Sequence, residues 1–312
     1  MRALVVRNYG GPEALEVADV PAPEPGRGQV RIRVEAAAVN PVDIATRQGL
    51  MNVARPGVIR DREHVGIGWD VAGTIDVPGP GVTSFGPGDR VIGLRDRLDQ
   101  PLGTYAELLV LDEADVAPAP QGVDSVAAST LPLNGLTAIQ ALDLLGLAAG
   151  QTVLVTGAAG GLGGFVVELA ALRGLRVIAS AGDDDEKLVT ALGAAAFVPR
   201  SADLATAVRD LVPGGVDAAF DAAVLGYPAL DAVRASGSYA AFVGSGPVPV
   251  RGIRVVPVVI HADGAALTAL SALAASGKLT LRVAGTYQLE DAPRAHERLE
   301  AGGVRGRLVL IP

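Results

Sequence analysis

Two patterns of hydrophobic and polar positions divide the chain. Up to about residue 120, apolar and polar residues alternate in short runs such as 30–34, and further β-branched runs occur near 71–75 and 91–92. Alternation with a period of two predicts short β-strands that bury one face. This part also holds more than half of the 21 prolines, which favours irregular loops between the strands.

From about residue 121 the pattern changes to strands that alternate with helices, after a first helix expected over 136–145. The strands are expected at 153–155, 176–179, 196–198, 216–221, 239–243 and 253–258. The helices that follow them are expected at 162–173, 184–192, 204–212, 228–234 and 264–275. Such alternation is typical of a doubly wound α/β fold, in which helices cover both faces of a parallel sheet.

The end of the chain has a third pattern. Strands at 282–285 and 307–311 and a helix at 292–299 have no place left in the parallel sheet. We therefore expect these elements to complete the first, strand-rich domain. The predicted organisation is a discontinuous first domain, residues 1–120 with 277–312, into which a second domain, residues 121–276, is inserted.

The strongest motif is a glycine-rich turn within Val153–Gly164, which follows an expected strand and opens an expected helix. In that context glycines let the backbone approach the pyrophosphate of a dinucleotide, and the free amides at the helix start bind it. The residues permit two registers. One is Ala158-x-Gly160-x-x-Gly163, and the other begins at Thr156 and is typical of short-chain dehydrogenases.

The rest of the chain does not support the second register. Short-chain dehydrogenases carry the turn near the N-terminus and have a Tyr-x-x-x-Lys motif further on. Tyr227, Tyr239 and Tyr287 follow the turn here, and none of them has a lysine four residues later. In the first register, the cofactor-binding residues of the turn are Ala159, Gly160, Gly161, Leu162 and Gly163.

The end of the second strand indicates which dinucleotide binds. Enzymes that use NAD usually have Asp or Glu there, which accepts hydrogen bonds from the ribose hydroxyls. This chain has Ser180, which leaves room for a 2′-phosphate, and Lys187 and Arg200 follow within reach. Residues 183–185 are three aspartates that add like charge nearby, although they also suit a helix N-terminus. We expect NADPH as the cofactor.

Composition excludes several classes of function. The chain has no cysteine, which removes disulfides and thiolate metal ligands. Its net charge of −8 gives no basic field for nucleic acid. The uncharged stretch 144–167 is long enough to cross a bilayer, but its glycines favour a strand, a turn and a helix start. Since the first strand contains arginines and does not resemble a signal peptide, we expect a cytoplasmic protein without a membrane segment.

Several further segments occur in a fixed order along the whole chain. They are Val39–Asp43, Gly68–Gly73, Gly86–Val91, Gly103–Glu107, Leu131–Ala138, Leu192–Ala194 and Gly306–Leu310. With the glycine turn, this order resembles the quinone oxidoreductase branch of the medium-chain dehydrogenase/reductase family. The resemblance implies a GroES-like first domain, a cofactor in the cleft between the domains, and a homodimer formed through the edge strand at 253–258.

The resemblance also implies roles for individual residues. Asn40 and Asp43 lie near the nicotinamide in such proteins, and Thr137 supports the cofactor. The segment after the fifth strand passes beside the nicotinamide ring, and the C-terminal segment contributes an arginine. The additional cofactor-binding residues are therefore Val243, Gly244, Ser245 and Arg307. Relatives that bind zinc use a cysteine and a Gly-His-Glu segment; this chain has only Glu63-His64 there, so we expect no catalytic metal.

The sequence determines the hydride acceptor less closely than it determines the cofactor. Enoyl reductases of this family often have a proton-donating tyrosine shortly after the Asn-x-x-Asp segment, where residues 47–51 contain none. Quinones do not need that donor, so we expect NADPH-dependent reduction of quinones or related α,β-unsaturated carbonyls. Tyr9, Tyr105 and Arg47 remain candidate donors.

Other interpretations stay open. Asn40 and Asp43 also suit a cap on a helix after Pro41. The chain could be a stand-alone enoyl reductase of polyketide or fatty-acid type. It could also be a protein that binds NADPH without catalysis, because a fold alone does not fix a function.

Overall fold

The chain forms two compact units that interleave along the sequence. The computed structural model describes residues 1–59, 63–242, 244 and 246–312. The first unit comprises Met1–Leu136, His261–Gly277 and Leu281–Pro312, and the second comprises Thr137–Ile260 and Lys278–Thr280. Each unit is described by itself below.

The first unit is built on two sheets whose neighbouring strands are antiparallel, except for the parallel pair β15 and β16. Its strands are β1 (Arg2–Val6), β2 (Leu15–Asp19), β3 (Gln29–Val39), β4 (Val65–Gly66), β5 (Asp70–Pro78), β6 (Arg90–Leu94), β7 (Leu108–Asp112), β8 (Val116–Pro118), β15 (Val283–Gln288) and β16 (Arg307–Ile311). They are ordered β2-β1-β4 in one sheet and β15-β16-β3-β5-β6-β8 in the other, with β7 on β3. Alternate residues of β3, such as Val30, Ile32 and Val34, are buried, as the period of two predicts.

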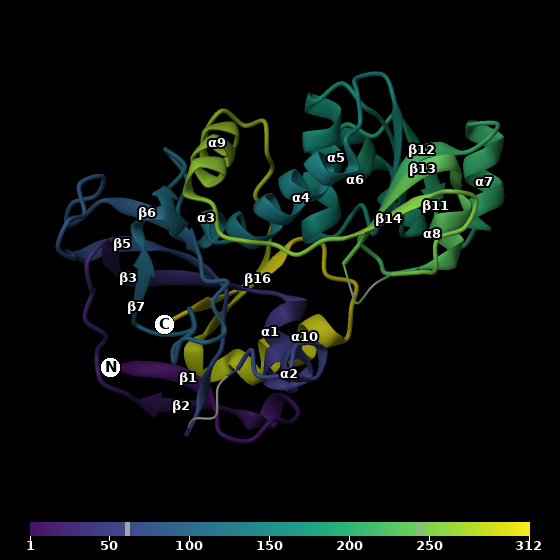
Figure 1. The fold of residues 1–312 in the computed structure, drawn as a ribbon. Coiled ribbons are helices and arrows are strands. Elements are labelled where there is room, and N and C mark those ends of the chain that lie inside the picture. Colours follow the sequence, from purple (N-terminus) through teal and green to yellow (C-terminus); the bar gives the residue numbers. More distant parts are fainter. Residues whose placement is uncertain (60–62, 243, 245) are drawn as a thin grey trace. The chain divides into compact units, whose positions relative to one another are not determined.

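The C-terminal segment joins this first unit, as the sequence pattern predicted. β16 pairs antiparallel with β3, so that Leu308 lies opposite Val39 (Figure 1). The helices of the unit are α1 (Pro41–Arg47), α2 (Leu50–Ala54), α3 (Ser125–Ala128), α9 (Gly264–Ala275) and α10 (Ala292–Glu300), with short 3-10 turns η1 (Pro12–Ala14), η2 (Glu113–Asp115) and η4 (Leu289–Asp291). Helix α4 (Pro132–Leu145) begins in the first unit and continues into the second.

The helix α9 differs from its expected place. It was assigned to the parallel-sheet domain, but it packs on β8, where the hydroxyl of Ser271 donates to the carbonyl of Pro118 over 2.8 Å. The two units consequently divide at other positions than 120 and 277, since 121–136 and 261–276 belong to the first unit. Helical periodicity shows that α9 buries an apolar face, but it does not show against which sheet.

The second unit is a parallel sheet with its helices. The strands are β9 (Thr152–Thr156), β10 (Arg176–Ala181), β11 (Ala196–Pro199), β12 (Val216–Asp221), β13 (Val233–Ala241) and β14 (Arg254–Pro257). The helices are α5 (Gly161–Leu172), α6 (Glu186–Ala191), α7 (Leu204–Leu211) and α8 (Tyr227–Asp231), and a 3-10 turn, η3 (Asp183–Asp185), precedes α6. The strand order is β11-β10-β9-β12-β13-β14, and every neighbouring pair is parallel.

That order is the one of a dinucleotide-binding Rossmann fold, so the predicted fold class is confirmed. The chain order reverses between β9 and β12, and ligands bind such sheets at the carboxyl ends of these strands. β14 lies at the edge, as predicted. β13 begins earlier than expected, because residues 233–234 form strand and do not extend the preceding helix.

The helices of the described residues give no candidate for crossing a membrane, since none combines sufficient length with sufficient apolarity.

Candidate functional site

The glycine turn has the geometry that close packing of helix on strand requires. Gly157 follows β9 with a φ of +60°, a region that favours glycine. Gly160 is the N-cap of α5, with extended φ and ψ angles of −73° and 172°. A Cβ atom added to Gly163 would lie 2.2 Å from the carbonyl oxygen of Gly157. The third glycine of a dinucleotide motif has this packing role, so the register Ala158-x-Gly160-x-x-Gly163 fits the structure.

The remaining residues expected in the turn lie at the start of α5. Gly160, Gly161 and Leu162 are partly exposed at the start of α5, and Ala159 is buried just before them. Since α5 has no acidic residue in its first turn, the positive end of its dipole is suited to an anion.

Ser180 lies directly beside this turn. In the parallel ladder it is the partner of Thr156, the last residue of β9, and its carbonyl accepts the amide of Ala158 over 3.1 Å. Arg200 follows β11, and its amide donates to the carbonyl of Ala181 over 2.7 Å. Lys187 and Arg200 are exposed, and neither forms an ion pair with another described residue. The structure thus places Ser180 at the turn and leaves both cations accessible.

The nearby aspartates bind backbone amides. Oδ1 of Asp183 accepts the amide of Ser201 over 3.3 Å, and Oδ2 of Asp185 accepts the amide of Gly182 over 3.1 Å. These bonds favour the interpretation that the run caps the start of a helix. The Asp183 bond also ties the loop after β10 to the loop that carries Arg200.

Asn40 and Asp43 lie in a buried polar cluster of the first unit, which also contains Asp70, Asn134 and Arg307. These five residues are between 0% and 8% exposed. Asn40 is the N-cap of α1, and Oδ2 of Asp43 accepts its backbone amide over 2.7 Å. The alternative that these two residues cap a helix is therefore correct, and it does not exclude a further role.

Every polar atom of the Asn40 side chain is used inside this cluster. Its Nδ2 donates to Oδ2 of Asp70 over 2.7 Å, and its Oδ1 accepts Nδ2 of Asn134 over 3.1 Å. Arg307 donates through Nη2 to Oδ1 of Asn134. Arg307 was expected to bind cofactor, and the structure places it in this cluster of the first unit, whereas the glycine turn belongs to the second unit.

The cluster is electrostatically unusual because charges are buried in it. Burial raises the pKa of Asp43 and of Asp70 to about 7, because water no longer stabilises the ionised carboxylates. Burial lowers the pKa of Arg307 to about 10, and the nearby Asp70 carboxylate opposes that change. Oδ1 of Asp43 has no hydrogen-bond partner among the described residues.

Two candidate proton donors point inward. The hydroxyl of Tyr105 donates to Oδ2 of Asp43 over 2.9 Å, and burial holds the pKa of Tyr105 well above its usual range. Arg47 is fully buried and donates through Nη2 to Oε1 of Glu300 over 2.6 Å. Tyr9 is 45% exposed, and its ring covers Gly49, where an added Cβ would lie 2.7 Å from Cδ2 of Tyr9. Tyr9 therefore reaches the corner between α1 and α2 from another part of the chain.

The other expected residues are placed as follows. Thr137 lies in the part of α4 that belongs to the second unit. Gly244 has a φ of +60° after β13, and Val243 and Ser245 lie outside the described residues. Glu63 forms an ion pair with Arg7 over 2.5 Å, and the described residues contain no metal-binding group of His, Asp and Glu side chains.

A second polar centre lies at the carboxyl end of β12, and no motif in the sequence indicated it. Asp221 is buried and accepts hydrogen bonds from the hydroxyls of Thr156 and Tyr239, each over 2.5 Å, and from the amide of Gly226 over 2.8 Å. It lines a hollow of the second unit together with apolar residues, among them Val224, Leu225, Tyr227 and Phe242. An acidic residue that ends an apolar parallel strand was the available signal.

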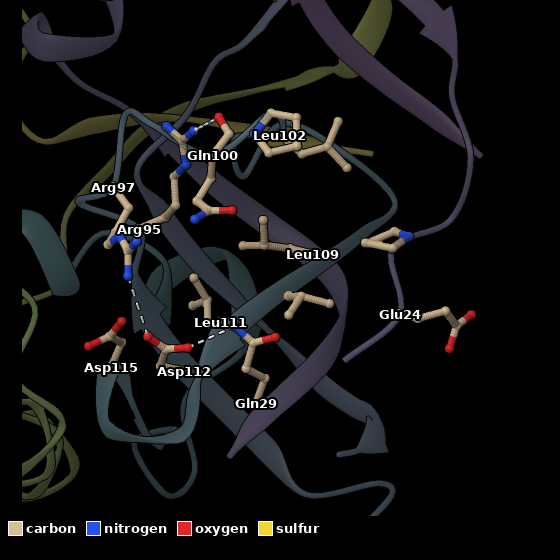
Figure 2. Close-up of a pocket in the computed structure, with 13 residues that line it drawn as sticks. Glu24, Gln29, Arg95, Arg97, Gln100, Leu102, Leu109, Leu111, Asp112 and Asp115 are labelled. Atoms are coloured by element: carbon tan, nitrogen blue, oxygen red, sulfur yellow. Dashed lines mark hydrogen bonds and ion pairs between the residues drawn. The ribbon is translucent and has the colours of Figure 1, made fainter. Parts of the chain in front are cut away.

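A further hollow lies on the first unit (Figure 2). Its charged walls are bonded to one another: Arg97 lies 3.8 Å from the Asp112 carboxylate, which also accepts Nε2 of Gln29 over 2.9 Å. Arg95 donates to the carbonyl of Gln100 over 2.8 Å. Because these groups are paired within the wall, the hollow does not indicate a particular ligand.

Comparison with known proteins identifies the family. Residues 26–121 match the alcohol dehydrogenase GroES-like domain, and residues 192–310 match the domain described as zinc-binding dehydrogenase. A quinone oxidoreductase of Pseudomonas aeruginosa is 30% identical over 97% of this chain and 97% of its own length. The chain belongs to the medium-chain dehydrogenase/reductase family, in its quinone oxidoreductase branch. The resemblance predicted from the sequence is thereby confirmed, and the chain is an oxidoreductase of this type.

Other family members differ in acceptor and cofactor. An NADPH-dependent alkenal/one oxidoreductase of Arabidopsis thaliana chloroplasts is 30% identical over all of this chain and 80% of its own length. The match to the chloroplast envelope quinone oxidoreductase homolog of the same plant, 37% identical, spans 62% of this chain and 59% of that protein. Among solved structures, a mycobacterial protein complexed with NADPH has a TM-score of 0.85 and 32% identity, with both chains fully covered. An NAD-dependent alcohol dehydrogenase has a TM-score of 0.87 and 34% identity, also with full coverage.

Proposed function

We propose that this family member transfers hydride from NADPH to quinones or related α,β-unsaturated carbonyls, without zinc. The observation that carries the proposal is Ser180 beside the glycine turn, where an NAD enzyme has an acid, with Arg200 accessible just after the neighbouring strand β11. When bound, NADPH supplies the hydride. The first amides of α5, from Gly161 onward, would hold its pyrophosphate, and Arg200 would bind the 2′-phosphate.

The cofactor is supported by more than one residue. Lys187 and Arg200 lack ion pairs in the described part of the chain, and the carboxylates of Asp183 and Asp185 are bound to backbone amides. A relative has been solved with NADPH, although another is named for NAD. We expect NADPH to bind at least tenfold more tightly than NADH, about 1.4 kcal/mol. Fluorescence titration of both dissociation constants tests this, and equal affinities contradict it.

The proposed electron acceptor is supported by the burial of two candidate proton donors. Reduction of an enone or enoyl thioester needs a proton at carbon, whereas the anion of a hydroquinone takes its proton from water. Tyr105 and Arg47 are buried and bonded to Asp43 and Glu300, which favours the acceptor that needs no protein donor. Tyr9 is accessible and is the residue to examine should enones be the better substrates.

One assay separates the alternatives. It compares kcat/KM for a small ortho- or para-quinone with that for a crotonyl-type thioester on the same preparation. We expect the quinone to be preferred. A tenfold preference for the thioester indicates the enoyl reductase, and NADPH binding without turnover of either substrate indicates a non-catalytic protein.

The absence of zinc and the quaternary structure are part of the same proposal. Without cysteine, a catalytic zinc site would need three ligands from histidines and carboxylates.

β14 leaves one strand edge open in the sheet of the second unit, and an apolar edge strand is a site for pairing with another chain. We propose that two copies pair through β14.

A further inference from the structure

The side-chain hydrogen bonds that connect Arg307, Asn134, Asn40 and Asp70 all point in one direction. Arg307 donates to Oδ1 of Asn134, Nδ2 of Asn134 donates to Oδ1 of Asn40, and Nδ2 of Asn40 donates to Oδ2 of Asp70. The donors therefore run from a guanidinium, through two amides, to a carboxylate. We call these four residues the amide chain.

The two ends of the amide chain decide how its middle is oriented. A guanidinium has no acceptor, and both oxygens of Asp70 accept hydrogen bonds, from Nδ2 of Asn40 and from the amide of Leu133. An amide can turn over and exchange its oxygen with its nitrogen, but turning Asn134 would place its NH₂ group against Arg307. Turning Asn40 would place its oxygen against the Asp70 carboxylate. One arrangement of both amides therefore satisfies every bond, and buried polar groups left without a partner are costly.

Asp70 also fixes the start of α4. Pro132, the first residue of that helix, has no amide hydrogen, and the next amide, that of Leu133, donates to Oδ1 of Asp70 over 2.5 Å. The first amides of a helix have no partner within it, so a carboxylate from β5 supplies one here. One buried side chain thus binds both the Asn40 amide and the first free amide of α4.

We propose that Asp70 and Arg307 are positioning residues, which orient Asn40 and the start of α4 for the reaction. The proposal rests on the proposed function, because it takes Asn40 to border the nicotinamide. The sequence indicated neither role: Arg307 was expected to bind cofactor, and Asp70 was only part of a family segment. Charge compensation supports it, since Arg307 is the guanidinium that interacts with both buried carboxyls, Asp70 and Asp43.

An exchange of two residues tests the amide chain. In Asp70→Asn, the NH₂ group of the new amide would face the NH₂ group of Asn40. In Asn40→Asp, the new carboxylate would face the carboxylate of Asp70. The double variant, Asn40→Asp with Asp70→Asn, restores a donor facing an acceptor, and it keeps the bonds to Asn134 and Leu133. Asp76→Asn is the matched control, because Asp76 lies on the same strand and binds Arg31 and Arg33 outside the amide chain.

Three readouts are measured on each full-length variant: kcat with a quinone, the NADPH dissociation constant, and the urea midpoint of unfolding. We expect each single variant to lower kcat at least tenfold with the NADPH constant within twofold, because the glycine turn lies in the other unit. The double variant should regain at least fivefold in kcat over Asp70→Asn, and its urea midpoint should exceed those of both single variants. Asp76→Asn should keep kcat within twofold.

A double variant no better than Asp70→Asn in either readout overturns the proposal, and so does an Asp70→Asn protein with wild-type kcat. Should Asp70→Asn not fold, two variants of Arg307 replace it in the test. Arg307→Lys keeps a group that can only donate hydrogen bonds to Asn134, whereas the amide introduced by Arg307→Gln can donate or accept. We then expect the kcat of Arg307→Lys to be at least fivefold higher than that of Arg307→Gln, and equal values overturn the proposal. A wild-type protein that reduces no quinone contradicts the proposed function instead, and the urea midpoints still report on the amide chain.

Discussion

Replacing Gly163 by alanine should damage NADPH binding through helix packing. The added Cβ would lie 2.2 Å from the Gly157 carbonyl oxygen and 2.8 Å from Cα of Ala158, where real Cβ contacts are essentially never below 3.0 Å. All the obstructing atoms belong to the backbone of the turn, so no side chain can rotate away. Helix α5 must therefore retreat from the turn by roughly 1 Å to restore van der Waals distances.

The magnitude combines two opposing effects. Overpacking of this kind costs about 1–3 kcal/mol, and alanine regains up to about 1 kcal/mol over glycine within a helix. We expect a net loss of about 1–2 kcal/mol in unfolding free energy. Because the same movement displaces the amides that bind pyrophosphate, the NADPH affinity should fall at least tenfold, about 1.4 kcal/mol.

Fluorescence titration with NADPH and urea unfolding measure the two effects. Gly135→Ala is the matched control, because its Cβ would meet only the ends of the Leu270 and Leu131 side chains, at 3.0 and 3.1 Å. That variant should keep its NADPH affinity within twofold. The reasoning is refuted when Gly163→Ala binds NADPH as tightly as the wild type, because α5 would then not rest on the turn as the structure shows.

Four further predictions can be checked independently. Arg200→Ala should weaken NADPH at least tenfold and leave NADH within twofold, measured by titration; equal losses contradict a 2′-phosphate contact. Exhaustive chelation should leave quinone turnover unchanged, and recovery that requires added zinc contradicts the proposal. Light scattering should give a dimer mass; a monomer at all concentrations contradicts pairing through β14. Burial lowers the pKa of His296 from 6.5 to about 3, so the unfolded chain alone binds that proton between these values. This histidine therefore lowers the unfolding free energy as pH falls through the window, by up to about 1.4 kcal/mol per unit. Asp43 and Asp70 act in the opposite direction, because their raised pKa values make the folded state bind protons there. The comparison with His296→Gln isolates the histidine: between pH 7 and pH 5 the wild type should lose more stability, or gain less, than the variant in urea unfolding.

The sequence predicted most of the fold because periodicity reports which faces are buried. Five of the six parallel strands appear at the expected places in the second unit, β13 begins earlier, and the C-terminal strand pairs with β3. Helix α9 was misplaced for a physical reason. Its buried face, formed by Leu267, Leu270 and Ala274, suits any apolar surface, and only the tertiary structure shows that β8 provides it.

The candidate site was predictable where backbone chemistry defines it. Gly163 and Ser180 stand in a motif whose spacing is set by the geometry of a strand, a turn and a helix. The amide chain was not predictable, because its members come from four distant segments around residues 40, 70, 134 and 307. No local pattern distinguishes an asparagine that meets a buried carboxylate from one that caps a helix, and Asn40 does both.

The double role of Asn40 and Asp43 bears on the chemistry. Asp43 accepts the amide of Asn40 and the hydroxyl of Tyr105 through one oxygen, and its other oxygen is fully buried. A carboxyl held in this way is suited to fixing its neighbours, and it has no described route for exchanging protons with water. Under the proposed function, Asn40 and Asp43 would form a rigid wall beside the nicotinamide and would not supply the proton. Such a wall favours acceptors whose reduced form is already a stable anion, and this links the buried cluster of the first unit to the proposed preference for quinones.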